Sequence, residues 1–96
     1  MVKPEPSAPR LEAAVEAGDP AQRAERLSEV LRDFCHALNN ALGTIALEHY
    51  SIDAGLEGMD VPADVTEALA NAEAARKAAV DLVGDLHQAA RALAQG

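Results

Sequence analysis

The sequence predicts an all-α protein, a long antiparallel helical hairpin that dimerises into a four-helix bundle. Apolar residues recur with a seven-residue period from residue 24 to 52 and again from 65 to 93, and a short segment with two glycines separates the two stretches. Alanine supplies much of the apolar content, and small side chains bury little area each. A lone hairpin of 96 residues would therefore have a thin core, so we expect a homodimer.

Residues 1–18 form a proline-rich leader that we expect to be largely disordered. Pro4, Pro6 and Pro9 all lie within the first ten residues. Residues 11–17 have the composition of a helix, but Gly18 stops it after about two turns. So short a helix is marginal alone, and it either docks on the bundle or forms only transiently.

The hairpin occupies residues 19–96, and its first helix should run from about residue 20 to 53. Asp19 suits the N-cap, Pro20 the first helical position, and Gln22 the position where a capping box has Glu or Gln. Gly43 weakens this helix by roughly 1 kcal/mol without ending it. Positions a and d of the heptad are occupied by Ala24, Leu31, Leu38, Ile45 and Ile52 and by Leu27, Phe34 and Ala41.

A loop at about residues 54–61 should join this helix to a second one at about residues 62–94. Pro62 suits a helix start. With the turn centred near Glu57, His36 should lie level with about Ala79. The apolar stripe is wide enough for neighbours on two sides, as in a four-helix bundle, and comprises Val65, Ala68, Leu69, Ala72, Ala75, Ala79, Leu82, Val83, Leu86, Ala89, Ala90 and Leu93.

The charge of the chain excludes several classes of function. Its net charge of −8 argues against nucleic acid and anionic membranes as partners, because both need a basic surface. No apolar run approaches a membrane span, and the N-terminus lacks the apolar core of a signal peptide. We expect a cytoplasmic protein. Cys35, His49 and His87 share no metal-ligand spacing, so we expect no metal and no cofactor of its own.

His36 is the candidate for chemistry. It falls at heptad position f, away from the predicted apolar seam, and Asn40 lies one turn further along the same helix. A histidine on the water side of a helix can meet a reactive group of another protein, whereas a core histidine cannot. Asp33, three residues earlier, could orient its ring.

The surrounding stretch, FCHALNNALGTI at residues 34–45, resembles the H-box of sensor histidine kinases. In that family the dimerisation and histidine phosphotransfer (DHp) domain carries phosphate on a helix-borne histidine. Residues 71–91, NAEAARKAAVDLVGDLHQAAR, resemble the second DHp helix, so the resemblance covers about residues 22–93. Ala37 replaces the acidic residue and Ala41 the proline of the family pattern, which is matched by Phe34, His36, Leu38, Asn39, Asn40, Leu42 and Ile45.

The resemblance implies a histidine phosphotransfer protein of a two-component phosphorelay. His36 would be the phosphoacceptor, Asn40 would orient the group or a water that removes phosphate from the partner, and a receiver domain would supply the Mg²⁺. The residues implied in docking a receiver or a kinase are Arg32, Gly43, Leu47, Tyr50 and Lys77. No glycine-rich ATP boxes follow, so the chain is not a complete kinase, and whether it counts as an enzyme stays open.

Ala37 keeps a second interpretation open. In the family the acidic residue polarises the imidazole for attack on ATP, and alanine cannot do so. Transfer to and from a receiver aspartate needs that carboxylate less, because an acyl phosphate is already reactive. The alternative is a non-phosphorylated DHp-like module that binds and regulates a histidine kinase or response regulator. A purely structural dimeriser and a fragment of a longer kinase also remain open.

Overall fold

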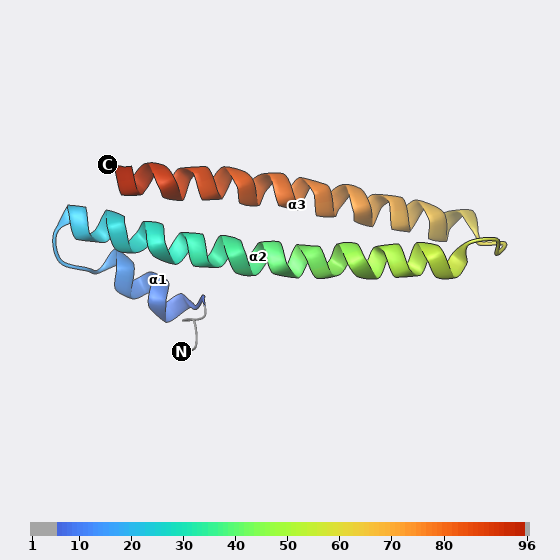
Figure 1. The fold of residues 1–96 in the computed structure, drawn as a ribbon, viewed down its shortest axis with the longest axis horizontal. Helices are drawn as coiled ribbons and strands as arrows, with labels where there is room; N and C mark the ends of the chain where they lie inside the picture. The colour runs from blue at the N-terminus through green and yellow to red at the C-terminus, as the bar shows by residue number, and fades with distance from the viewer. Residues whose placement is uncertain (1–5, 96) are drawn as a thin grey trace.

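In a computed structural model, which describes residues 6–95, the protein is a long helical hairpin with a short helix at its side (Figure 1). Helix α1 spans Ala8–Val15, α2 Pro20–Leu56 and α3 Ala63–Gln95. Helices α2 and α3 run antiparallel side by side, and α1 packs on the N-terminal part of α2. The molecule measures 61 × 28 × 18 Å. The described residues contain no strand, which confirms the all-α class.

Helix α2 begins at Pro20 because Asp19 caps it. The carboxylate of Asp19 accepts a hydrogen bond from the backbone N–H of Gln22 at 2.9 Å. The helix ends at Leu56, three residues beyond the predicted end. Gly55 lies inside it, since one glycine costs a helix only about 1 kcal/mol, and the chain reverses at Gly58, whose φ of 77° suits glycine.

The leader is more ordered than predicted. Residues Ala8–Val15 form α1, which Ser7 caps by accepting a hydrogen bond from the N–H of Arg10 at 3.3 Å. Ala14 and Ala17 are buried against the hairpin, and Arg10 forms an ion pair with Asp33 of α2 at 2.9 Å. The prediction of a largely disordered leader is therefore wrong for this segment. Docking on α2 supplies the buried contacts that so short a helix lacks when it is alone. The prediction for residues 1–5 lies outside the described residues.

Small side chains line the contact between α2 and α3. The hydroxyl of Ser28 donates to the carbonyl of Ala90 at 2.5 Å, and the thiol of Cys35 lies 3.7 Å from the carbonyl of Val83. All four residues are buried. Burial also raises the pKa of the Cys35 thiol. The two backbones therefore approach closely here, with room for little more than a hydroxyl or a thiol between them.

The intrachain contact follows heptad position e of α2, one step around the helix from the predicted a and d rows. It is marked on α2 by a row of buried or half-buried residues spaced by seven, namely Ser28, Cys35, Leu42, His49 and Leu56. The apolar a row is left at the side of this contact. On each helix, a residue that follows a contact residue is turned by about 100° from the contact. Because the helices are antiparallel, this turn points to the same side of the hairpin on both helices.

One side of the hairpin is apolar and uncovered. We call it the bundle face, and its large residues are between 41% and 68% exposed: Leu38, Ile45, Ile52, Val65 and Leu82. The opposite side, the histidine face, carries Arg32, His36, Gly43 and Tyr50 from α2 and Lys77, Gly84, His87 and Arg91 from α3. No helix among residues 6–95 is both long and apolar enough to cross a membrane.

Candidate functional site

His36 lies exposed on the histidine face of α2. Its neighbour Cys35 points into the contact with α3, so the next residue along the helix is turned by about 100° toward the side of the hairpin. The side chain therefore stands at the edge of the groove between the two helices, open to a partner. The position away from the apolar face agrees with the heptad frame.

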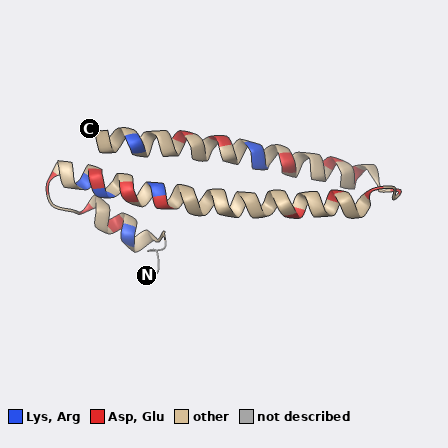
Figure 2. Cartoon of the chain, viewed as in Figure 1, with Lys and Arg blue, Asp and Glu red and all other residues tan. Residues whose placement is uncertain are grey.

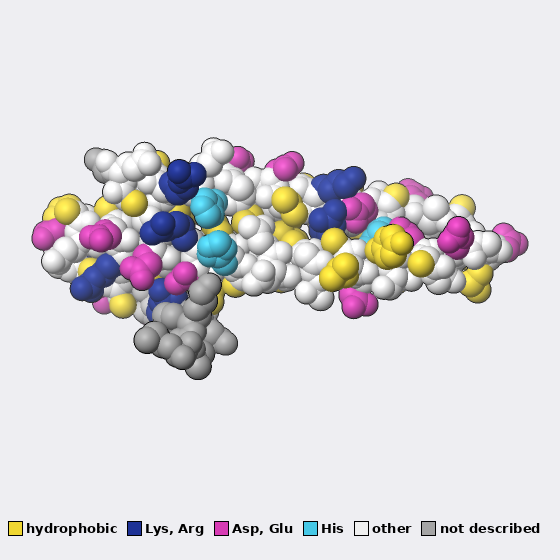
Figure 3. All heavy atoms as spheres, in the orientation of Figure 1, with side chains coloured by type: hydrophobic (Ala, Val, Ile, Leu, Met, Phe, Trp, Pro, Cys, Tyr) yellow, Lys and Arg dark blue, Asp and Glu magenta, His cyan; other side chains and the backbone are white. Residues whose placement is uncertain are grey.

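A second histidine meets His36 from the other helix. The rings of His36 and His87 lie edge to face, with centroids 6.1 Å apart and planes at 85°. In Figure 3 two histidine side chains touch across the boundary between α2 and α3. His87 is half-buried. Among residues 6–95, the histidine pair is the one place where α2 and α3 bring two imidazole rings together.

The sequence reasoning missed His87 because it placed the turn too early. A turn centred near Glu57 sets His36 level with Ala79, whereas the observed contacts set Cys35 level with Val83 and His36 against His87. The longer α2 and the reversal at Gly58 account for the displacement.

Two arginines flank the histidine pair. Arg32 lies one turn before His36 on α2, and Arg91 one turn after His87 on α3, so in antiparallel helices both lie on the same side of the pair. Figure 3 shows two basic side chains directly beside the two histidines. Neither arginine forms an ion pair with another described residue. Figure 2 shows how few basic residues the hairpin has besides these.

The remaining site residues predicted on α2 continue from His36 toward the loop. Asn40 is exposed one turn on, and its backbone carbonyl accepts a hydrogen bond from the Thr44 hydroxyl at 3.1 Å. Leu47 and Tyr50 are 70% and 74% exposed. A β-carbon added at Gly43 would meet nothing within 4 Å. This side of α2 is thus a long open surface with two large apolar groups at its far end.

Asp33 does not orient the His36 ring. Its carboxylate is engaged by the Arg10 guanidinium of α1 at 2.9 Å. The ion pair turns Asp33 toward the short helix, on the side of α2 away from α3. In place of a carboxylate, His36 has the imidazole of His87 as its ring neighbour.

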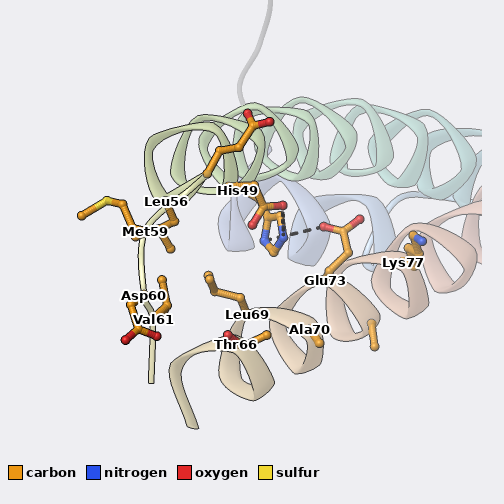
Figure 4. Close-up of a pocket in the computed structure, with 13 residues that line it drawn as sticks. His49, Leu56, Met59, Asp60, Val61, Thr66, Leu69, Ala70, Glu73 and Lys77 are labelled. Atoms are coloured by element: carbon orange, nitrogen blue, oxygen red, sulfur yellow. Dashed lines mark ion pairs between the residues drawn. The ribbon is translucent and has the colours of Figure 1, made fainter. Parts of the chain in front are cut away.

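Lys77 belongs to a different cluster, near the loop. There His49 lies with its Nε2 3.3 Å from Asp53 and its Nδ1 3.8 Å from Glu73 (Figure 4). Arg76 also forms an ion pair with Glu73. The hydrogen bond from Arg76 holds the pKa of Glu73 below its usual range. His49, Asp53, Glu73 and Lys77 line an open groove of about 810 Å³, whose lining also includes Leu56 and Met59.

Gly84 leaves open space beside His36. It follows Val83, whose carbonyl faces Cys35, so it lies within about 3 Å of the level of His36 along the hairpin. A β-carbon added there would meet nothing within 4 Å. Nothing in the packing of residues 6–95 therefore requires glycine in the middle of α3.

Replacing Gly84 with alanine should stabilise the protein by about 1 kcal/mol, because alanine is the better helix former and meets no neighbour. Urea unfolding followed by circular dichroism would measure the change. The contrasting variant is Gly58→Ala, which should be destabilising because φ is 77° there. A loss of stability in Gly84→Ala would mean that another surface packs against α3 at this level.

Comparisons with known proteins provide no relative: no family model, no curated protein and no solved structure matches this chain. Among residues 6–95, no group of three or more His, Cys, Asp or Glu is arranged to hold a metal ion. The residues and their geometry therefore carry the functional conclusion.

Proposed function

We propose that this protein is a histidine phosphotransfer protein, which carries a phosphoryl group on His36 to or from the aspartate of a receiver domain. The observation that carries the proposal is the place of His36, exposed on a long helix at the edge of an open face, with Gly84 opposite it. The H-box-like stretch around His36 supports the same function.

The transfer needs little from the carrier beyond a placed nucleophile. The lone pair of the unprotonated imidazole nitrogen of His36 attacks phosphorus, the bond from phosphorus to the aspartyl oxygen breaks, and its electron pair leaves with the carboxylate. The other ring nitrogen keeps its proton. Phosphoryl transfer depends mainly on positioning and on neutralising charge. The helix supplies the first, and the receiver's Mg²⁺ with the nearby arginines would supply the second.

The proposal includes a homodimer in which two hairpins form a four-helix bundle. The bundle face supports it, because it gathers five large apolar residues from both helices on one side of the hairpin. The buried residues of one hairpin are mostly small, so a single copy gains little from its own core. Pairing through this face leaves both histidine faces outward, each able to meet a receiver.

The experiment is phosphotransfer from labelled donors. The purified protein is mixed with phosphorylated receivers and active hybrid kinases from the same genome, with His36→Ala and His49→Ala alongside. Acid-labile, base-stable label should appear on the wild type and on His49→Ala and be absent from His36→Ala. Equal labelling of all three proteins would refute His36 as the acceptor.

A second function, a non-phosphorylated module that binds and regulates a kinase or receiver, is favoured by Ala37 and by the surface around Leu47 and Tyr50. Both apolar side chains are largely exposed and lie on the outer side of α2. A receiver could dock there whether or not phosphate moves. In the same mixtures this function predicts binding and a changed lifetime of the partner's phosphate, with no label on this protein and no dependence on His36.

A further inference from the structure

The histidine face carries an unexplained concentration of hydrogen-bond donors. In a chain with a net charge of −8, two of its eight basic residues, Arg32 and Arg91, lie one turn from the only pair of edge-to-face imidazoles among the described residues. Of the other basic residues within 6–95, Arg10 is paired with Asp33 and Arg76 with Glu73, whereas Arg23, Arg26 and Lys77 form no ion pair. An anion bound between Arg32 and Arg91 would offset the repulsion between their like charges.

We infer that His36, His87, Arg32 and Arg91 form an oxyanion site across α2 and α3, which binds a phosphate-class dianion between the two imidazoles and the two guanidinium groups. His87 and the arginines hold the oxygens, while His36 faces the phosphorus. The inference rests on the proposed function for the identity of the phosphoryl group, and it adds His87 and Arg91 of the second helix to the site.

The chemistry of the four side chains fits this ligand. Each imidazole offers an N–H donor, and each guanidinium offers a planar fork of donors suited to two oxygens at once. The donors come from two antiparallel helices, and so they approach an anion in the groove from both sides. The acidic groups nearest along α2 are Glu29 and Asp33, and Asp33 is already neutralised by Arg10.

A transition metal is the competing ligand for two histidines. Structural zinc takes four ligands, and no group of three or more ligating side chains is assembled within residues 6–95. The unpaired guanidinium groups of Arg32 and Arg91 would also repel a cation. The geometry therefore favours an anion as the ligand, and binding of a metal ion is the alternative that the experiment tests.

The experiment is a titration of the full-length protein with inorganic phosphate, at constant pH and ionic strength, followed by the imidazole signals in ¹H–¹⁵N spectra. The rings of His36 and His87 should shift together and saturate, whereas His49, held between Asp53 and Glu73 near the loop, should not. Chloride at the same ionic strength should produce no saturating shift. Equal shifts of all three histidines would overturn the site.

Variants test which residues hold the oxygens. His87→Gln and Arg91→Gln should each weaken phosphate binding about tenfold, because each removes a charge-assisted hydrogen bond. Lys77→Gln is the matched control, since it removes the same charge from the same face of α3 but lies by Glu73. Equal weakening by Arg91→Gln and Lys77→Gln would reduce the effect to net charge and overturn the proposal. Arg91 is exposed, so its variant should fold even if His87→Gln does not.

The outcomes separate this inference from the proposed function. Saturable phosphate binding that depends on Arg91, without label from any donor, would keep the oxyanion site and refute the carrier. Phosphotransfer through His36 that is unchanged in His87→Gln and Arg91→Gln would support the phosphocarrier function and refute the oxyanion site. Shifts of the histidine pair with Zn²⁺ and none with phosphate would overturn the anion in favour of a metal.

Discussion

Replacing Ile45 with glutamate should halve the mass of the protein in solution, from a dimer of two 10.0 kDa chains to a monomer. Ile45 lies in the middle of the bundle face and is 51% exposed in the single hairpin. In the proposed four-helix bundle it would be covered, and a carboxylate there would lose its water without gaining a partner. Sedimentation equilibrium measures the mass, and thermal unfolding at several protein concentrations measures the coupling of stability to association.

The matched control is Leu47→Glu. Two residues along a helix correspond to about 200° of rotation, so Leu47 lies nearly opposite Ile45 on the same turn. It is even more exposed, at 70%, and its variant should remain a dimer with unchanged unfolding. If both variants stay dimeric, the copies associate through another surface. A monomeric wild type would refute the dimer altogether.

The second large effect is expected inside the hairpin. Replacing Ser28 with leucine should cost about 3 kcal/mol of unfolding free energy, because the side chain is fully buried and its oxygen lies 2.5 Å from a carbonyl of α3. A leucine there would have to push the helices apart along the row that contains Cys35. Urea unfolding at one fixed protein concentration provides the measurement.

Two variants calibrate this loss. Ser28→Ala removes only the hydrogen bond and should cost about 1 kcal/mol. Ala37→Leu adds the same bulk at an exposed position and should change stability by less than about 0.5 kcal/mol. If Ser28→Leu proves as mild as Ala37→Leu, the two helices do not approach as closely as the contact between Ser28 and Ala90 requires.

The sequence by itself determined the helices and the exposure of the candidate nucleophile. Asp19 and Pro20 mark where α2 begins, and the heptad pattern places His36 away from the apolar rows, as the structure has it. These features depend on local capping and on helical periodicity, which a single chain segment carries in its own residues. The existence of a wide apolar stripe could be read in the same way.

Only the tertiary structure decided which part of that stripe the hairpin uses for itself. The contact between α2 and α3 follows Ser28 and Cys35, because small side chains let the backbones approach, and this leaves Leu38 and Ile45 uncovered. Periodicity could not choose between these neighbouring rows, since both suit a helix surface. The docking of α1 likewise depends on burial of Ala14, which no local pattern predicts.

The meeting of His36 with His87 also came from the tertiary structure alone. Fifty-one residues separate them in the sequence, and their level is fixed by where α2 ends and where Gly58 reverses the chain. An error of a few residues in the loop moves a helix by a full turn relative to its partner, at 1.5 Å per residue. Local propensity fixes which residues are helical, whereas register across a hairpin depends on the loop geometry and on the packing of small residues.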